Sequence, residues 1–181
     1  MNQWTNRQTR YISVGGVIAL LCIMTIGIGC SKEATNYRDR VKTALEQADL
    51  KDVDVTEDAN TNTIKLGGKV HSEEAKSRAG DVAQANAGQR TVANEISVEP
   101  VGNESAARSM ESNLDDGIEN NYKAALISKG LDKQHIRYEA KNGVLTIKGS
   151  VRNNKEKQQA EELAQNTPNG RQVLNQLDVR R

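Results

Sequence analysis

The sequence contains two copies of one pattern. Residues 64–70 (IKLGGKV) match residues 145–151 (LTIKGSV), which places Gly68 and Gly149 81 positions apart. The same separation recurs in the pairs Ala44 and Ala125, Leu45 and Leu126, Leu50 and Leu131, Ala79 and Ala160, Ala83 and Ala164, Arg90 and Arg171, Asn94 and Asn175, and Val98 and Val179. Self-similarity at a fixed spacing is typical of duplicated structural units. The chain is therefore expected to fold as two similar modules.

Each copy has the same order of hydrophobic periodicities. A helical spacing of apolar residues precedes two short alternating stretches, a second helical spacing and a final alternating stretch. The first two alternating stretches meet at Asn62 in one copy and at Asn142-Gly143 in the other, which predicts a β-hairpin in each. The fold class is therefore α+β, with two tandem αββαβ modules, each a three-stranded sheet with two helices on one face.

Composition and charge limit how such modules can be stabilised. Aromatic residues make up 3% of the chain and Phe is absent, so the cores must be aliphatic. A module of about 65 residues is near the lower size for a self-sufficient core, since it buries only about 60% of its unfolded surface. Residues 35–99 carry a net charge of −3 and residues 113–181 a net charge of +3. Docking of the acidic copy on the basic copy would enlarge the buried area.

The amino terminus has the features of an export signal. Arg7 and Arg10 precede an apolar run that ends with Gly27-Ile28-Gly29-Cys30. The pattern resembles a bacterial lipoprotein signal, which implies that residues 1–29 are removed and that Cys30 is lipidated. Ser31 after the cysteine is similar to the pattern of lipoproteins sent to the outer membrane. The alternative is that residues 12–29 stay uncleaved as an inner-membrane anchor. Both interpretations place the remaining chain on the periplasmic side.

Three features of the repeat carry a resemblance to a known family. They are the glycine near the end of the second strand, the Ala-rich second helix and the Val-x-Asn-x-hydrophobic-x-Val ending. Together they resemble BON domains, with one domain at 35–99, a linker at 100–112 and a second domain at 113–181. The residues after Ser105 either extend that linker or begin a helix. The tandem arrangement is similar to dual-BON envelope lipoproteins, which implies a periplasmic, non-catalytic protein that associates with phospholipid and supports envelope integrity.

No pattern of residues indicates an enzyme, a cofactor or a metal. His71 and His135 stand alone, without the neighbours that a zinc site needs. Asp58, Asn60 and Asn62 match the start of a calcium loop, but the glycine and glutamate that this loop requires are missing, so an ordinary turn is favoured. The sequence also contains no dinucleotide fingerprint, phosphate loop or nucleophile elbow. Neither a small-molecule substrate nor nucleic acid is expected as a partner.

Four cations at the start of the last helix form the candidate functional site. Lys148, Arg152, Lys155 and Lys157 lie around a predicted helix amino terminus, where Asn153 and Glu156 form a capping-box pattern. Free backbone N–H groups and added cations would make an anion site there, and anionic phospholipid is the expected ligand. Two alternatives remain open: these residues are solubilising charges, or the modules bind another envelope protein or a cell-wall polymer.

Overall fold

The computed structural model describes residues 36–180 of the 181-residue chain. Residues 35–181 belong to one compact unit, which contains both predicted modules. The proposed signal at residues 1–29, the alternative anchor at residues 12–29 and Cys30 all lie outside the described residues.

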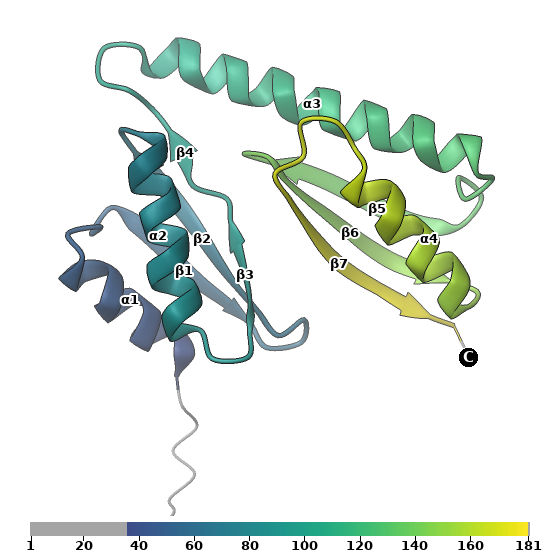
Figure 1. Ribbon diagram of the computed structural model, residues 1–181, viewed down its shortest axis with the longest axis horizontal. Helices are drawn as coiled ribbons and strands as arrows, with labels where there is room; N and C mark the ends of the chain where they lie inside the picture. Colours follow the sequence, from purple (N-terminus) through teal and green to yellow (C-terminus); the bar gives the residue numbers. More distant parts are fainter. Residues whose placement is uncertain (1–35, 181) are drawn as a thin grey trace, which may run out of the picture. The chain divides into compact units, whose positions relative to one another are not determined.

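The first module contains two helices and a mixed sheet (Figure 1). β2 is central in this sheet, antiparallel to β1 and parallel to β3 and β4. The chain runs through α1 (Tyr37–Gln47), β1 (Val53–Asp58), β2 (Thr63–Val70), α2 (Glu73–Asn86), β3 (Thr91–Asn94) and β4 (Ser97–Val98). The two helices pack on one face of the sheet, as predicted (Figure 1).

The third strand of the first module differs from the expectation because it is interrupted between β3 and β4. The pairing register with β2 is the same before and after the break, so the interruption is local. Gly67 and Gly68 of β2 lie beside it, and glycine weakens a strand because it has no side chain to pack. The second module has only Gly149 at the matching place, and its last strand runs unbroken.

The second module repeats the same topology with one extended helix. Its elements are α3 (Glu104–Ser128), β5 (His135–Lys141), β6 (Val144–Val151), α4 (Asn154–Gln165) and β7 (Gln172–Val179). β6 is central, antiparallel to β5 and parallel to β7. α3 has 25 residues where α1 has 11. Residues 104–112 therefore form the first turns of α3, which is the second of the two possibilities given for the residues after Ser105.

Each module has its own core of aliphatic side chains between helices and sheet. The matching residues Leu66 and Ile147 are fully buried in the two cores. Tyr122 is the largest buried side chain, and its hydroxyl donates to the carbonyl of Ala160 at 3.2 Å. Burial raises the pKa of Tyr122 well above its usual range, so the hydroxyl stays a donor. The expectation of aliphatic cores therefore holds for the buried residues of the first core, whereas the second core contains Tyr122, with Tyr138 packed against it.

The repeated glycines Gly68 and Gly149 allow the hairpin strands to approach closely. Gly149 has φ +112°, and a Cβ there would lie 1.9 Å from the carbonyl oxygen of His135. Gly68 has φ +90° and the same relation to the carbonyl of Asp52, at 2.3 Å. Only glycine fits this backbone without displacement of the neighbouring strand. The two copies therefore share the same requirement for glycine.

Candidate functional site

The four predicted cations lie on consecutive elements of the second module. Lys148 is a half-buried residue of β6, and Arg152 lies in the turn before α4. Lys155 and Lys157 belong to the first turns of α4, and only Lys157 is partly buried. The chain therefore places all four around the end of β6 and the start of α4.

Two of the four cations already have partners within the protein. The guanidinium of Arg152 lies 3.1 Å from a carboxylate oxygen of Glu156, four residues later. The ammonium of Lys157 donates to the backbone carbonyl of Leu177 in β7 at 2.5 Å. The side chains of Lys148 and Lys155 form no ion pair or hydrogen bond within residues 36–180. These two are the cations that remain available to an external anion.

The amino terminus of α4 is also partly occupied by the protein's own side chains. The amide oxygen of Asn153 accepts from the N–H of Glu156 at 2.9 Å, as the capping pattern predicts. The carboxylate of Glu156 accepts from the N–H of Arg152 at 3.0 Å, one residue before the cap. A bound anion at this helix end would therefore lie beside a carboxylate, which reduces the attraction that the helix dipole alone would give.

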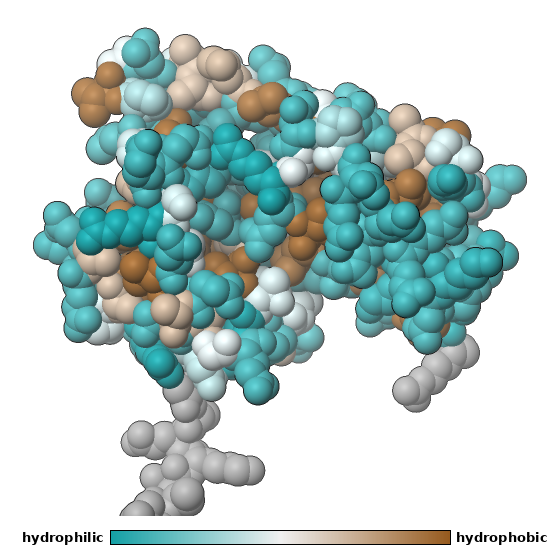
Figure 2. Space-filling model, in the orientation of Figure 1, coloured by the Kyte–Doolittle hydropathy of each residue, from teal (hydrophilic) through white to brown (hydrophobic). Residues whose placement is uncertain are grey.

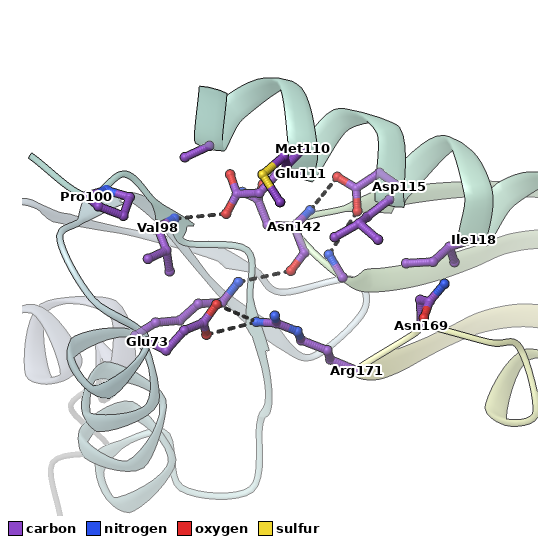
Figure 3. Close-up of a pocket in the computed structure, with 14 residues that line it drawn as sticks. Glu73, Val98, Pro100, Met110, Glu111, Asp115, Ile118, Asn142, Asn169 and Arg171 are labelled. Atoms are coloured by element: carbon purple, nitrogen blue, oxygen red, sulfur yellow. Dashed lines mark hydrogen bonds and ion pairs between the residues drawn. The ribbon is translucent and has the colours of Figure 1, made fainter. Parts of the chain in front are cut away.

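A second cluster of polar residues, which the sequence patterns did not reveal, joins the two modules. Its centre is Lys76 of α2, whose side chain is 6% exposed. The ammonium of Lys76 donates to the backbone carbonyl of Asn142 in the β5–β6 turn at 3.0 Å (Figure 3). The matching residue of the repeat, Lys157, donates within its own module. The same position therefore serves two different purposes in the two copies.

Asn142 holds the β5–β6 turn between α3 and the first module. Its side-chain amide donates to the carbonyl of Glu95 at 2.7 Å. Its backbone N–H and that of Gly143 donate to the two carboxylate oxygens of Asp115 in α3, at 2.7 and 2.9 Å. Positive φ angles at Asn142 and Gly143 fit the hairpin turn that the Asn-Gly pair predicts.

Gln172 at the start of β7 makes a further bridge to the first module. Its side chain donates to the carbonyl of Val92 and accepts from the N–H of Asn94 at 3.2 Å, so it bonds to the edge of β3 as a strand would. A small apolar cluster of Ala93, Val144 and Leu174 lies at the same contact. The docking that the opposite module charges predicted is thus present, with amide and apolar contacts at its centre.

Ion pairs lie around these contacts. Arg171 binds Glu73 at 2.9 Å, and Lys141 binds Glu95 at 3.2 Å. Glu95 is buried and also pairs with Lys65 of its own module at 3.1 Å. The Glu73–Arg171 pair is about half exposed on both sides, so its contribution to stability is small. The buried carboxylate of Glu95, with a cation from each module, is the more specific contact.

The environment of Lys76 is electrostatically mixed. Burial is the main cause that lowers the pKa of Lys76, and Arg171 adds to it by repulsion. Glu73, Glu111 and Asp115 act in the opposite direction. A partly desolvated ammonium with a single protein acceptor is a strong donor toward any further anionic or carbonyl group.

The protein-family model of the BON domain matches the chain at residues 34–100 and again at residues 114–181. The chain belongs to the BON domain family. No curated protein matches this BON chain significantly. Two solved structures of CdsD, a structural protein of the type III secretion system of Chlamydia trachomatis, are similar to it.

The similarity to CdsD is distant. One CdsD structure, of its C-terminal domain, shares 12% identity with a TM-score of 0.33, over 81% of this chain and 98% of that chain. The other shares 15% identity with a TM-score of 0.32, over 78% of this chain and 91% of that chain. TM-scores this low give no basis for assigning an arrangement or a function to the two BON modules.

BON domains occur in envelope and periplasmic proteins, which agrees with the sequence interpretation at that level. Among the helices within residues 36–180, none combines the length and hydrophobicity needed to cross a membrane. The same residues contain no group of three or more His, Cys, Asp or Glu side chains that could hold a metal ion. His71 is an exposed residue in the bend between β2 and α2, and its ring nitrogen Nδ1 lies 3.0 Å from the carbonyl of Glu99.

Proposed function

We propose that the protein is a non-catalytic, lipid-tethered BON protein of the cell envelope whose second module associates with anionic phospholipid. In this proposal Cys30 carries the lipid, and the outer membrane is its location. The association uses Lys148 and Lys155, with Arg152 and Lys157 contributing to the local positive potential. The function is structural support of the envelope rather than chemistry on a substrate.

One observation carries the proposal: the cations without partners are concentrated on the second module. Within the described residues of the first module, only the side chains of Arg40 and Arg78 lack an ion pair or hydrogen bond. The second module has six such side chains, Lys123, Lys129, Lys133, Arg137, Lys148 and Lys155. Free cations attract an anionic surface, whereas cations already paired with carboxylates do not.

Vesicle co-sedimentation of residues 35–181 tests this proposal. We expect binding to vesicles that contain phosphatidylglycerol, with no binding to pure phosphatidylcholine and with loss of binding at high salt. Each cation near an anionic surface contributes about 1 kcal/mol, so the double variant Lys148→Glu/Lys155→Glu should weaken binding by roughly 30-fold or more. The matched control is Arg40→Glu/Arg78→Glu, which makes the same charge change on partner-free residues of the first module.

Equal losses from the two double variants would mean that net charge alone, rather than the second module, determines binding. Absence of any vesicle binding, together with a crosslink to an envelope protein, would favour the alternative of a protein-interaction adaptor. Binding that does not depend on ionic strength would also contradict the proposed cationic site.

The tether has its own test. Cys30→Ala in the full chain should abolish lipid attachment and leave the signal unprocessed. In the lipoprotein signals that this segment resembles, the peptidase cleaves before a cysteine that already carries the lipid. Mass spectrometry of the amino terminus in the membrane fraction measures this directly. An intact, unmodified amino terminus in the unaltered protein would contradict lipidation and favour the uncleaved anchor at residues 12–29.

A further inference from the structure

A cavity of about 340 Å³ lies where α3 passes the contact between the two modules (Figure 3). The size is within the range of small-molecule sites in proteins. One wall is apolar and is formed by α3 and the end of the first sheet. The other is polar and is formed by α2, the β5–β6 turn, the loop before β7 and the acidic side chains of Glu111 and Asp115 on α3. The apolar wall consists of Val98, Pro100, Ala107, Met110, Leu114 and Ile118.

The apolar wall is open to solvent along α3. Met110 is 66% exposed and Leu114 46% exposed, although both line the cavity. Figure 2 shows apolar surface beneath α3 within a mostly hydrophilic face. Ile118, four residues further along the same helix face, is fully buried in the second core. An aliphatic ligand in the cavity would cover Met110 and Leu114 and continue the apolar stripe that Ile118 begins.

On the polar wall several hydrogen-bond donors have no acceptor, whereas every carboxylate oxygen already accepts at least one hydrogen bond from the protein. Glu111 accepts from the hydroxyl of Ser97 and the N–H of Val98, at 2.6 and 2.9 Å. Both oxygens of Asp115 accept from the β5–β6 turn, and both oxygens of Glu73 accept from Arg171. Each of the three acidic side chains therefore has both oxygens engaged.

The cations of the same wall are only partly engaged. The ammonium of Lys76 has three N–H donors, and within residues 36–180 one of them has an acceptor, the carbonyl of Asn142. Arg171 uses one of its two terminal nitrogens on Glu73 and leaves the other free toward the described residues. A ligand that matches this wall is therefore an acceptor with negative charge rather than a cation.

We propose that this cavity binds a single-chain anionic amphiphile, with its alkyl chain against Met110 and Leu114 and its carboxylate or phosphate at Lys76 and Arg171. No aromatic side chain lines the cavity, so the wall fits an alkyl chain better than a planar ring. Lys76, which is almost completely buried, supplies the fixed donor that a surface lysine would not. The site is distinct from the cations around α4 and does not depend on membrane association.

Calorimetric titration of residues 35–181 with monomeric ligands tests the proposal without any vesicle. Decanoate represents a fatty acid, and decyl phosphate represents a single-chain phospholipid. Binding of either one supports the site, and the tighter of the two identifies the head-group chemistry. Decan-1-ol and decyltrimethylammonium have the same chain with a neutral or a cationic head, and we expect both to bind at least tenfold more weakly.

Three variants locate the ligand within the cavity. Lys76→Met retains the length of the side chain without its donors and should weaken decanoate or decyl phosphate binding by about tenfold or more. The control is Arg78→Met on the same helix, an exposed residue that does not line the cavity, and its binding should stay within about twofold of the unaltered protein. Leu114→Asp places a charge on an exposed residue of the apolar wall and should also weaken binding by about tenfold or more.

Several results would overturn the proposal. They are the absence of binding by both anions, equal binding of decan-1-ol, and binding that Leu114→Asp leaves unchanged. If circular dichroism shows that Lys76→Met does not fold, Arg171→Gln tests the same polar wall at an exposed residue. Unchanged binding in the Arg171→Gln variant would then contradict the proposal. Failure of vesicle co-sedimentation leaves this titration unaffected, so the two proposals succeed or fail separately.

Discussion

At the scale of single residues, the duplicated chain shows which positions the fold requires and which are free to change. Gly68 and Gly149 keep the same left-handed backbone and the same close approach to a neighbouring carbonyl. Lys76 and Lys157 keep their chemical type but donate to different carbonyls. The repeat marks the two glycines as matching positions, and the structure supplies the reason, because the backbone at both places fits only glycine. The sequence could not distinguish the two lysines, because their acceptors are backbone atoms that leave no pattern.

The backbone requirement at Gly149 gives the first stability prediction. Gly149→Ala should destabilise the second module by about 2 kcal/mol or more, because positive φ costs an L-residue about 1–2 kcal/mol and the new Cβ also collides with the His135 carbonyl. Gly117→Ala is the control, since Gly117 is a helical glycine with open space around its Cβ position. That change should stabilise by about 0.5–1 kcal/mol. Urea unfolding measures both, and a neutral Gly149→Ala would show that the strand shifts without cost.

At the scale of elements, the sequence predicted the core-facing helices and strands because their apolar residues are buried at regular spacing. The predicted stripes of α1 and α3 supply the buried residues Val41, Leu45, Ile118, Tyr122 and Leu126. For the first half of α3 the sequence does not decide between linker and helix, because these residues face the cavity and solvent rather than a core. This half forms a helix through good helix formers such as Ala106, Ala107 and Met110, which carry little information about burial.

The two cores can be tested by shortening the buried side chains at one matching strand position, Leu66 in β2 and Ile147 in β6. Ile147→Ala should cost about 2–5 kcal/mol, because the removed side chain is completely buried and leaves a cavity. Leu66→Ala should have a similar cost in the first module, where the matching residue is equally buried. Ile127→Ala is the control, since this side chain is 55% exposed and should change stability by less than about 0.5 kcal/mol. Thermal midpoints equal to that of the control would show that these strand residues do not stabilise the fold.

At the scale of the whole described chain, polar side chains at the ends of elements determine how the modules meet. Asn142, Gln172 and Lys76 each bond to backbone atoms of the other module. The sequence predicted that an acidic and a basic copy would dock, but not where. Gln172 matches Thr91 in the repeat, and a polar residue at the start of a strand is compatible with simple exposure. The contact between the modules depends on how the two copies are placed in space, and the sequence alone does not give that placement.

The module contact leads to the last prediction, in which the hairpin turns of the two copies behave differently. Asn142→Gly keeps a residue that tolerates positive φ and keeps the carbonyl that accepts from Lys76, but it removes the amide that donates to Glu95. Combined with Gln172→Ala, it removes both amide bridges to the first module. The exposed Glu73–Arg171 pair contributes too little to replace them. We expect the double variant to show faster, independent tumbling of the two modules in ¹⁵N relaxation and two separate urea transitions.

Asn62→Gly is the matched control for that experiment, because Asn62 occupies the corresponding hairpin turn with φ 52° but donates to Gln89 of its own module at 3.1 Å. The ¹⁵N relaxation of the Asn62→Gly variant should equal that of the unaltered protein. We expect at most a small loss of stability in its first module. Joint tumbling and a single transition in the Asn142→Gly/Gln172→Ala variant would contradict the role given to the amides. The apolar contact of Ala93, Val144 and Leu174, with the buried Glu95 carboxylate between two lysines, would then be what holds the modules together.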